Sequence, residues 1–394
     1  MPACPPSTRV HRRSGLSALT VLALGAFTLG TSELAVAGLL PVIGDDLGTS
    51  PGTAGTLVTA YAVGVALLGP LLAAVLRRVP RRRTLLGALA AQVVGNGLTA
   101  FATWFPALLA ARALAGAAAA VYAVTAMATA ASLTGPERQG RAVSLVFGSI
   151  TVATVVGVPS STLLGDLFGW RAVYAVLTVV AAGVLAAAVG LVPEPIPAAS
   201  ATREVQPSAV IGVRLLFTYT ANATVTAGHY TAATYFVELL THRTGLGTAA
   251  VSTVLVASGL AGTAGAVLGG VAADRHTRRT LLSAAAVLVC SLSVLSAVMS
   301  VPALTWPVAM IWMAAFSAFS TAAQVTVTRQ APGADIAAAA NIAVFNTGIA
   351  AGSALGGLAL HLFGFAGVTL AGAALFVAGL AALLPHAASP RTCG

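Results

Sequence analysis

One carboxylate and one guanidinium stand well inside apolar segments of this chain. Glu33 lies in the apolar run 17–41, and Arg112 lies in the apolar run 106–132. A charge at bilayer depth costs several kcal/mol, roughly 3 on insertion scales, so each side chain must face the protein interior. Glu33 lies eight residues before Pro41, and Arg112 lies six residues after Pro106, at the ends of their runs. At 1.5 Å per residue, Glu33 is about 12 Å and Arg112 about 9 Å below the same outer surface. We therefore expect these opposite charges to lie close enough to interact.

The carboxylate of such a pair can bind a proton and release it again. Burial favours the protonated form of a carboxylate, and a nearby arginine favours the ionised form. A site that alternates between wet and dry, or between near and far from Arg112, would bind and release a proton in turn. Binding of another molecule beside Glu33 could displace this proton. The alternative is a static ion pair that only orders the helices.

Polar and aromatic residues predict a central cavity. Asn222, Thr226 and His229 share one helix face, and similar polar stripes occur in the runs 303–328 and 337–361. Polar side chains in lipid usually form hydrogen bonds between helices. Each stripe taken alone could serve this structural role instead of lining a cavity. Together the stripes suggest a hydrated cavity between helices. The candidate cavity residues are Tyr61, Tyr122, Asn222, His229, Tyr230, Gln324, Asn341 and Asn346, with Phe147 and Tyr235 as further aromatic candidates.

The elements that must position these residues are membrane-spanning helices. The chain is 58% hydrophobic and 8% charged, whereas soluble domains carry about 25% charged residues. A spanning helix needs about 20 apolar residues. Twelve segments qualify: 17–41, 53–76, 84–104, 106–132, 141–165, 171–192, 211–237, 248–272, 280–300, 303–328, 337–361 and 366–385. Ser50 before Pro51 predicts a capped helix start.

An internal repeat divides these segments into two sets. Residues 69–86 read GPLLAAVLRRVPRRRTLL, and residues 266–283 read AVLGGVAADRHTRRTLLS, at an offset of 197. Parallel repeats of about six helices each are a transporter architecture. The sequence thus predicts an all-α membrane protein of twelve helices, with six-helix bundles over 1–192 and 211–394 and a cytoplasmic linker over 193–210.

Arginine placement predicts the orientation. All 20 basic residues are arginine. If the chain crosses the membrane at each of the twelve segments, seventeen of them fall on the side of the N-terminus. Arg171 and Arg243 fall on the opposite side. Cytoplasmic loops attract positive residues. We therefore predict a multi-pass protein of the bacterial cytoplasmic membrane with both termini inside, and the net charge of +10 then indicates topology rather than nucleic-acid binding.

The repeated loop is a candidate cytoplasmic gate. In the second half, Gly270, Asp274, Arg275, Arg278 and Arg279 form the pattern G-x-x-x-D-R-x-x-R-R. The aspartate can bond to loop arginines or to a neighbouring helix N-terminus, and such a cluster can hold one conformation closed. The alternative is that these arginines only set topology. The corresponding residues of the first half are Arg77, Arg78, Arg81 and Arg82.

Other activities find little support in the sequence. It contains no G-x-x-x-x-G-K-[ST] for ATP, no H-E-x-x-H and no C-x-x-C, and its three cysteines are scattered. No ring of charges or filter loop indicates a channel. We predict a transporter rather than an enzyme, with no cofactor, no metal site and the proton gradient as its energy source.

Several motifs resemble the major facilitator superfamily. The gate pattern resembles that superfamily's loop signature, although Ala73, Arg77 and Pro80 replace its residues in the first half. Leu108-x-x-x-Arg112 resembles its helix 4 signature, whose arginine is linked to proton coupling. Gly148, Gly157 and Pro159 resemble the helix 5 signature of drug–proton antiporters, with Val158 in place of a usual glycine. Five further motifs resemble the 12-helix drug–proton antiporters. They are Gly30-Thr31-Ser32-Glu33-Leu34, Leu40-Pro41-Val42-Ile43, Gly169-Trp170-Arg171, Asn341-x-x-x-x-Asn346-Thr347-Gly348 and Ala73–Pro80.

Within the superfamily these motifs most resemble the 12-helix chloramphenicol-resistance and arabinose-efflux-permease exporters. The resemblance implies a monomeric efflux protein that works by alternating access in the lipid bilayer. It implies export of a small amphiphilic drug or natural product, with a chloramphenicol-like antibiotic as the specific prediction, in exchange for protons. Efflux of sugars or nucleosides is the first alternative, and uptake by symport is the second.

Overall fold

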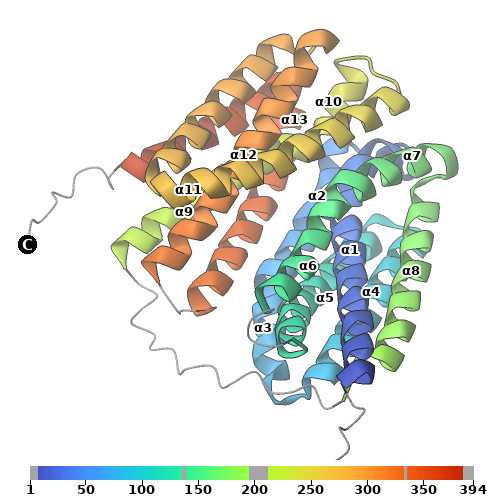
Figure 1. The fold of residues 1–394 in the computed structure, drawn as a ribbon. Helices are drawn as coiled ribbons and strands as arrows, with labels where there is room; N and C mark the ends of the chain where they lie inside the picture. The colour runs from blue at the N-terminus through green and yellow to red at the C-terminus, as the bar shows by residue number, and fades with distance from the viewer. Residues whose placement is uncertain (1–7, 135–138, 195–211, 332–334, 385–394) are drawn as a thin grey trace, which may run out of the picture.

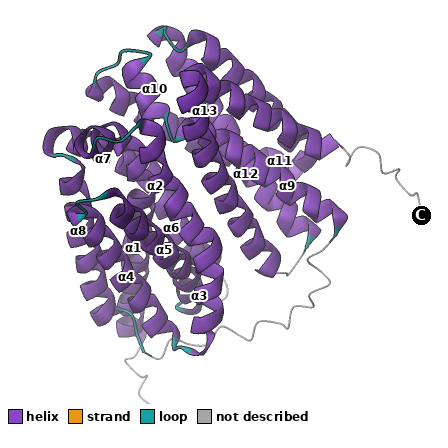
Figure 2. Ribbon diagram, turned by 180° about the vertical axis from the view of Figure 1, so that it is seen from behind, coloured by secondary structure: helices purple, strands orange, loops and turns teal. Residues whose placement is uncertain are grey.

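The computed structural model describes residues 8–134, 139–194, 212–331 and 335–384. Helices account for nearly all of these residues, and no strand occurs among them (Figure 2). A chain in lipid must satisfy its backbone polar groups internally, and long helices achieve this. The all-helical fold that the sequence predicts is confirmed.

Helices α1 to α8 form the first group in chain order. They are α1 (Thr8–Leu47), α2 (Pro51–Val63), η1 (Gly64–Leu68), α3 (Gly69–Val75), η2 (Leu76–Arg78), α4 (Arg81–Phe101), α5 (Phe105–Ser132), α6 (Gln139–Val152), η4 (Ala153–Gly157), α7 (Val158–Phe168) and α8 (Trp170–Leu191). The second group comprises α9 (Val213–Ala233), α10 (Phe236–His242), α11 (Thr248–Val298), α12 (Pro302–Gln330) and α13 (Asp335–Leu383).

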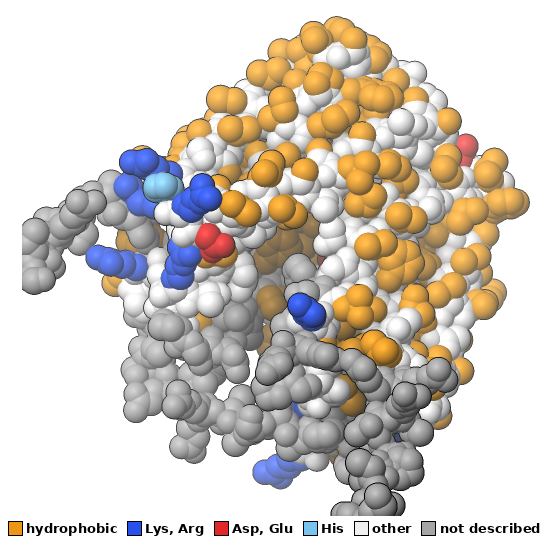
Figure 3. All heavy atoms as spheres, in the orientation of Figure 1, with side chains coloured by type: hydrophobic (Ala, Val, Ile, Leu, Met, Phe, Trp, Pro, Cys, Tyr) orange, Lys and Arg blue, Asp and Glu red, His pale blue; other side chains and the backbone are white. Residues whose placement is uncertain are grey.

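The two groups lie side by side and touch along a limited seam (Figure 1). The seam joins α2 to α13, α7 to α11 and α1 to α10. One end of the molecule carries α10, and here the two groups meet. The opposite end, where α4 begins and α11 bends, carries the arginines of the repeated loops, and we call it the arginine-bearing end. Near that end the surface is hollowed between the groups (Figure 3).

Two helices of the first group contain a π-helical turn that the sequence reading missed. The turn η1 precedes Pro70, and η4 precedes Pro159. A proline ring clashes with the carbonyl four residues earlier and removes one helical hydrogen bond. A widened π turn accommodates that residue without ending the helix. The predicted runs 53–76 and 141–165 are therefore continuous helical rods with a bulge in each.

Helix ends agree with some predictions and correct others. Ser50 caps α2, because its hydroxyl accepts a hydrogen bond from the Thr53 N–H at 3.2 Å. The predicted span 211–237 is wrong at its end, since α9 stops at Ala233 and the separate helix α10 follows. Tyr235 occupies the break with φ −106° and ψ 15°.

Nine helices of the described ranges are long and apolar enough to cross a membrane. Two of them bend: α11 has non-helical backbone at His276, and α13 turns at Gly364 with φ 66°, a left-handed conformation that glycine adopts without strain. Each has 49 residues or more, enough for two spans at about 20 residues each. The total of twelve spans stays a prediction, as do the domain boundaries, because most of the predicted linker lies outside the described residues.

The outer surface is rich in exposed apolar side chains (Figure 3). Leu67, Val179 and Phe363 are 66%, 72% and 72% exposed on three different helices. Apolar exposure of this extent requires lipid contact, because soluble monomers rarely expose large contiguous apolar patches. The chain is a multi-pass membrane protein.

Candidate functional site

Arg112 lies at the centre of the first group with no solvent exposure. Its Nη1 donates to the Ser32 hydroxyl at 3.2 Å, and its Nη2 donates to the Ser32 carbonyl at 2.9 Å. The Ser32 hydroxyl in turn donates to Asn96 Oδ1 at 2.6 Å. The Tyr174 hydroxyl also donates to the Ser32 carbonyl, at 3.4 Å. Helices α1, α4, α5 and α8 therefore meet in one polar network.

Two aromatic rings hold the guanidinium in place. The Arg112 Cζ lies 4.7 Å from the centre of the Tyr61 ring and 5.4 Å from that of Tyr174, within range of cation–π attraction. Gly116 makes this arrangement possible, since a Cβ there would lie 2.1 Å from the Tyr61 carbonyl oxygen. Gly116 thus lets α2 pack closely against α5.

Glu33 stands beside this network and remains partly exposed. Both Glu33 and Arg112 are described, and the two form no direct salt bridge; they interact through space. Glu33 also lies within electrostatic range of Tyr61 and, from the second group, Tyr230. The prediction that the two charges interact is therefore consistent with the structure. The expected contact is electrostatic, because Ser32 takes the arginine's hydrogen bonds.

Tyr230 belongs to an aromatic cluster of the second group, together with His229, Phe316 and Phe345. His229 stacks on Phe316 with ring centres 3.5 Å apart and an interplanar angle of 2°. Tyr230 meets Phe316 and Phe345 edge-on, at 6.3 and 6.4 Å between ring centres. Tyr230 and Phe345 are partly exposed, so their rings are open to contact by a bound molecule. Aromatic side chains offer large apolar contact areas.

A chain of amides runs through the same group. Asn222 Nδ2 donates to Asn341 Oδ1 at 2.9 Å, and Asn341 Nδ2 donates to Gln324 Oε1 at 2.7 Å. Thr226 Oγ1 lies 3.5 Å from Asn222 Oδ1. Gln324 is partly exposed at the end of the chain, and no hydrogen bond of the described residues uses its amide nitrogen. The amide chain therefore presents a hydrogen-bond donor.

Several predicted cavity residues lie elsewhere. Tyr122 is buried in the first group and donates to the Leu22 carbonyl at 2.9 Å, so we correct its placement in the cavity wall. Tyr61 is equally buried and serves the arginine network. Asn346 is buried and bonds to the Ile342 carbonyl of its own helix at 3.0 Å.

Sequence reasoning missed the cluster's phenylalanines. Phe316 and Phe345 carry no polar atom and look like ordinary lipid-facing residues in an apolar run. Only their spacing relative to Ser317 and Asn346, one residue away on polar stripes, offered a signal. The side chain of Phe147, a further aromatic candidate, lies outside the described part of the molecule.

The loop residues of the candidate gate form contacts within each group. Asp274 pairs with Arg329 of α12 at 3.2 Å, and Arg329 also bonds to the Ala273 carbonyl and the Thr277 hydroxyl. The expected partners, the loop arginines Arg275, Arg278 and Arg279, are exposed instead, and we correct that pairing. Gly270 packs beside Thr321 of α12, with 3.5 Å from an ideal Cβ to its methyl group.

In the first group, Arg82 fastens the start of α4 to the end of α8. Its Nη2 donates to the Val189 carbonyl at 2.6 Å, its Nε to the Val192 carbonyl at 3.0 Å, and its Nη1 pairs with Glu194 at 3.0 Å. Arg78 is exposed, and Arg81 is only half-buried. The side chain of Arg77 lies outside the described residues. The gating role of these residues stays a prediction.

The residues of the helix 5 motif lie against α1. A Cβ on Gly157 would lie 2.4 Å from the Thr31 hydroxyl oxygen, two residues before Glu33. Pro159 is buried and follows the last residue of the π segment η4 by two positions. Gly148 has open space where a Cβ would stand. The motif thus sets how closely α1 and the η4 turn approach.

A buried carboxylate, Glu238, lies on α10, just beyond the predicted span 211–237. The Glu238 side chain is 4% exposed and pairs with His242 at 2.9 Å. Burial raises the pKa of Glu238, which the charge of His242 partly offsets and that of Asp45 reinforces. Asp46 also lies at this end and pairs with Arg171, while Trp170 Nε1 donates to Asp46 at 3.1 Å.

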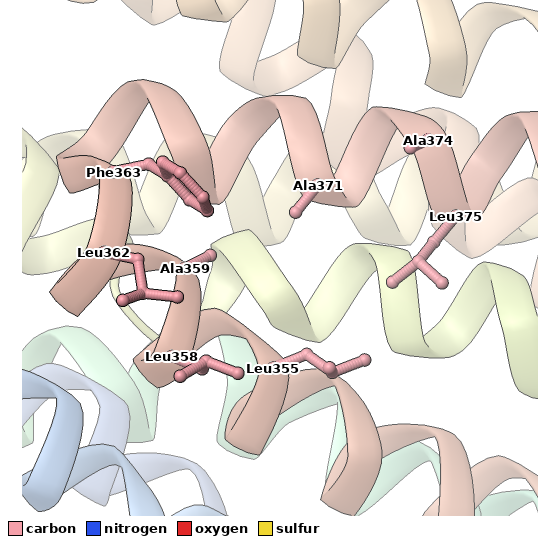
Figure 4. A pocket seen from close by; sticks show the side chains of 8 residues that line it. All are labelled: Leu355, Leu358, Ala359, Leu362, Phe363, Ala371, Ala374 and Leu375. Atoms are coloured by element: carbon pink, nitrogen blue, oxygen red, sulfur yellow. The ribbon is translucent and has the colours of Figure 1, made fainter.

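A groove of about 390 Å³ between the two arms of α13 is not a polar site (Figure 4). Eight apolar side chains line it: Leu355, Leu358, Ala359, Leu362, Phe363, Ala371, Ala374 and Leu375. Leu358 and Phe363 are 54% and 72% exposed on the outer surface. The groove therefore belongs to the lipid-facing surface, and the charged and hydrogen-bonding groups of the candidate site lie elsewhere.

Two helical groups, a hollow between them and a carboxylate–arginine site define a membrane transporter for small molecules. Comparison with known proteins agrees. The family model for the Major Facilitator Superfamily matches residues 22–341. A chloramphenicol resistance protein of Streptomyces lividans is 38% identical over 271 residues, covering 67% of this chain and 68% of the relative. The chain belongs to the Major Facilitator Superfamily.

Further matches cover almost the whole length. An uncharacterized MFS-type transporter of Bacillus subtilis, YtbD, is 32% identical over 369 residues, covering 88% of this chain and 89% of the relative. The crystal structure of a bacterial homolog of the human lysosomal transporter Spinster, in an inward-facing and unoccupied conformation, has a TM-score of 0.70 at 15% identity. It covers 97% of this chain and 96% of that chain, and it shares the fold.

Proposed function

We propose that this protein exports small amphiphilic molecules across the bacterial cytoplasmic membrane in exchange for protons, by alternating access. A chloramphenicol-like antibiotic is the specific substrate we propose, and the similarity to the Streptomyces lividans protein supports it. A natural product of the host is the related possibility. In this proposal both termini and the arginine-bearing end face the cytoplasm, and the protein works as a monomer.

One observation carries the proposal: Glu33 is partly exposed beside Arg112 and across from Tyr230. A partly exposed carboxylate can take up a proton and can interact with an incoming substrate. The arginine's charge favours release of the proton once water reaches the site. The aromatic cluster around Tyr230 supplies apolar contact area for a ring-bearing substrate. Glu33 thus serves as the proton carrier and Arg112 as its electrostatic partner.

Accumulation of labelled chloramphenicol tests the export itself. Drug-sensitive cells that express the protein should accumulate less label than control cells, and a proton uncoupler should abolish the difference. Unchanged accumulation, with the protein shown in the membrane, contradicts the chloramphenicol assignment.

The proton carrier is tested in reconstituted vesicles. Glu33→Gln should lose transport driven by a pH gradient, because the amide cannot release a proton. Asp166→Asn is the matched control, since this carboxylate is exposed on α7 and should be dispensable. Full gradient-driven transport by Glu33→Gln would show that another group carries the proton.

Efflux of sugars or nucleosides is the second candidate. The amide chain from Asn222 through Asn341 to Gln324 favours it, because polyhydroxyl substrates are recognised by such donors and acceptors. Labelled arabinose and uridine in the same assay separate the candidates. Export of either, with chloramphenicol retained, would support this alternative, and gradient-driven uptake would support symport.

A further inference from the structure

Ser32 occupies an unusual position between the two charges. It directly precedes Glu33 in α1 and is completely buried. Both its hydroxyl and its carbonyl accept hydrogen bonds from Arg112, at 3.2 and 2.9 Å. Consecutive residues on an α-helix point about 100° apart. An arginine that is bonded to Ser32 is therefore adjacent to Glu33 but directed at a different face of the helix.

Asn96 completes the arrangement from α4. Its Oδ1 accepts from the Ser32 hydroxyl at 2.6 Å, which orients the hydroxyl's lone pairs toward Arg112. Asn96 itself has no solvent exposure, and its Nδ2 has no partner among the described residues. A buried unpaired donor costs free energy. The Oδ1 contact to Ser32 is therefore the one side-chain hydrogen bond that Asn96 makes with the described residues.

Arg112 still has a free donor. Its Nε makes no hydrogen bond to any described residue. Glu33, in turn, accepts no hydrogen bond from the described residues. A rotation of the guanidinium off Ser32 would let Nε or Nη1 approach the carboxylate. A direct charge-assisted bond is stronger than a neutral one, so such a rotation would give a second, competing arrangement of Arg112.

We propose that Ser32 and Asn96 are positioning residues that hold Arg112 on the backbone of α1 and keep it out of a direct ion pair with Glu33. The proposal rests on the proposed proton-carrying role of Glu33. In this arrangement the arginine acts on Glu33 only through space, and the carboxylate keeps its capacity to take up a proton. Loss of the Ser32 hydroxyl frees one guanidinium nitrogen for Glu33.

Three charged or titratable groups of the described residues interact electrostatically with Glu33. They are Arg112 on α5, Tyr61 on α2 and Tyr230 on α9. Tyrosines remain neutral under ordinary conditions. Arg112 is therefore the one permanent charge in this set, and its distance from the carboxylate acts together with the burial of Glu33 on how readily Glu33 holds its proton.

Infrared spectroscopy of the purified full-length protein over a pH series tests the proposal without any substrate. The C=O band of protonated Glu33 is identified as the band that Glu33→Gln lacks. In Ser32→Ala the midpoint of this band should move to lower pH by about one unit, as expected for a closer arginine. Asn96→Leu should move it in the same direction by less, because the Ser32 hydroxyl remains.

Thr28→Ala is the matched control. Its hydroxyl is also buried in α1, but it bonds only to the Leu24 carbonyl of its own helix, at 2.9 Å. Its band midpoint should equal that of the unaltered protein. Thermal unfolding of each variant shows that the fold is retained, and Asn96→Leu serves if Ser32→Ala does not fold.

The outcomes separate the two proposals. Unshifted midpoints in folded Ser32→Ala and Asn96→Leu would overturn the positioning role and leave the proton carrier intact. A shift in Thr28→Ala equal to that in Ser32→Ala would also overturn it, since any hydroxyl of α1 would then suffice. Absence of any band that depends on Glu33 would refute the proton carrier and, with it, the positioning role.

Discussion

The seam between the two helical groups predicts a sharp effect of adding one methyl group at Gly55. This glycine of α2 faces Tyr235, which follows α9. An ideal Cβ at Gly55 would lie 2.0 Å from the Tyr235 hydroxyl oxygen and 2.5 Å from its ring carbon Cζ. The tyrosine cannot easily yield, because its hydroxyl donates to the Ser353 carbonyl at 2.9 Å and the ring touches Gly356 on the other side.

The expected magnitude follows from overpacking. Extra methylene groups in a well-packed core cost about 1–3 kcal/mol. Gly55→Ala can relieve this cost by separating the two groups at the end that carries α10. A difference of that size corresponds to a change of about 5- to 150-fold in a conformational equilibrium. We therefore expect Gly55→Ala to favour the conformation open at this end by such a factor and to slow transport.

Thiol labelling of intact cells measures this opening. Thr59 is half-buried on α2, and its hydroxyl lies 3.4 Å from the Ala350 carbonyl across the seam. Thr59→Cys is introduced after the three native cysteines are replaced by serine. A membrane-impermeant maleimide should label it faster in Gly55→Ala. Thr53→Cys, exposed at the same end, reports whether the reagent reaches that end from outside.

Gly87→Ala is the matched control, since a Cβ at Gly87 meets no atom within 4 Å. It should label at the rate of the unaltered protein. Thr59→Cys could react equally fast with and without Gly55→Ala while Thr53→Cys is labelled. Packing at the seam would then not limit access of the maleimide to position 59. The argument from packing at Tyr235 would then be refuted.

Three further predictions concern stability and affinity. Arg82→Gln should lower the free energy of unfolding by about 1.5–3 kcal/mol, since it removes charged hydrogen bonds to backbone carbonyls; Glu194→Gln should cost about 1 kcal/mol or less, because its ion pair is half exposed. Thermal unfolding in detergent measures both, and equal losses would contradict this assignment. Burial raises the pKa of Glu238, so its contribution to stability is greatest below the unfolded-state pKa and is lost as the pH rises through the folded-state pKa. Glu238→Gln should therefore flatten the fall in melting temperature over that window, and an unchanged pH profile would exclude Glu238 as its source. Asn341→Leu should weaken binding of a polyhydroxyl substrate about 5- to 150-fold through loss of about 1–3 kcal/mol, measured as the Michaelis constant of transport into inverted membrane vesicles, and should weaken binding of an apolar aromatic substrate much less.

Much of the architecture could be predicted because it depends on local properties of the chain. The runs of apolar residues, the cap at Ser50 and the break between the runs 248–272 and 280–300 follow from hydropathy and from residues next to each other in sequence. The isolation of Glu33 and Arg112 in apolar runs was equally visible, since the cost of burying a charge applies wherever the helix packs. That cost is why two residues among so many could be selected from the sequence.

The details of the site depend on how the helices are rotated and aligned against one another. A helix that is hydrophobic all round has no apolar stripe to show which face turns inward. Hence the sequence could not show that Arg112 donates hydrogen bonds to Ser32, that Arg329 forms an ion pair with Asp274, or that Phe316 stacks on His229. Those contacts join helices distant in the chain, and only tertiary packing fixes the rotation and depth of each helix that brings them together.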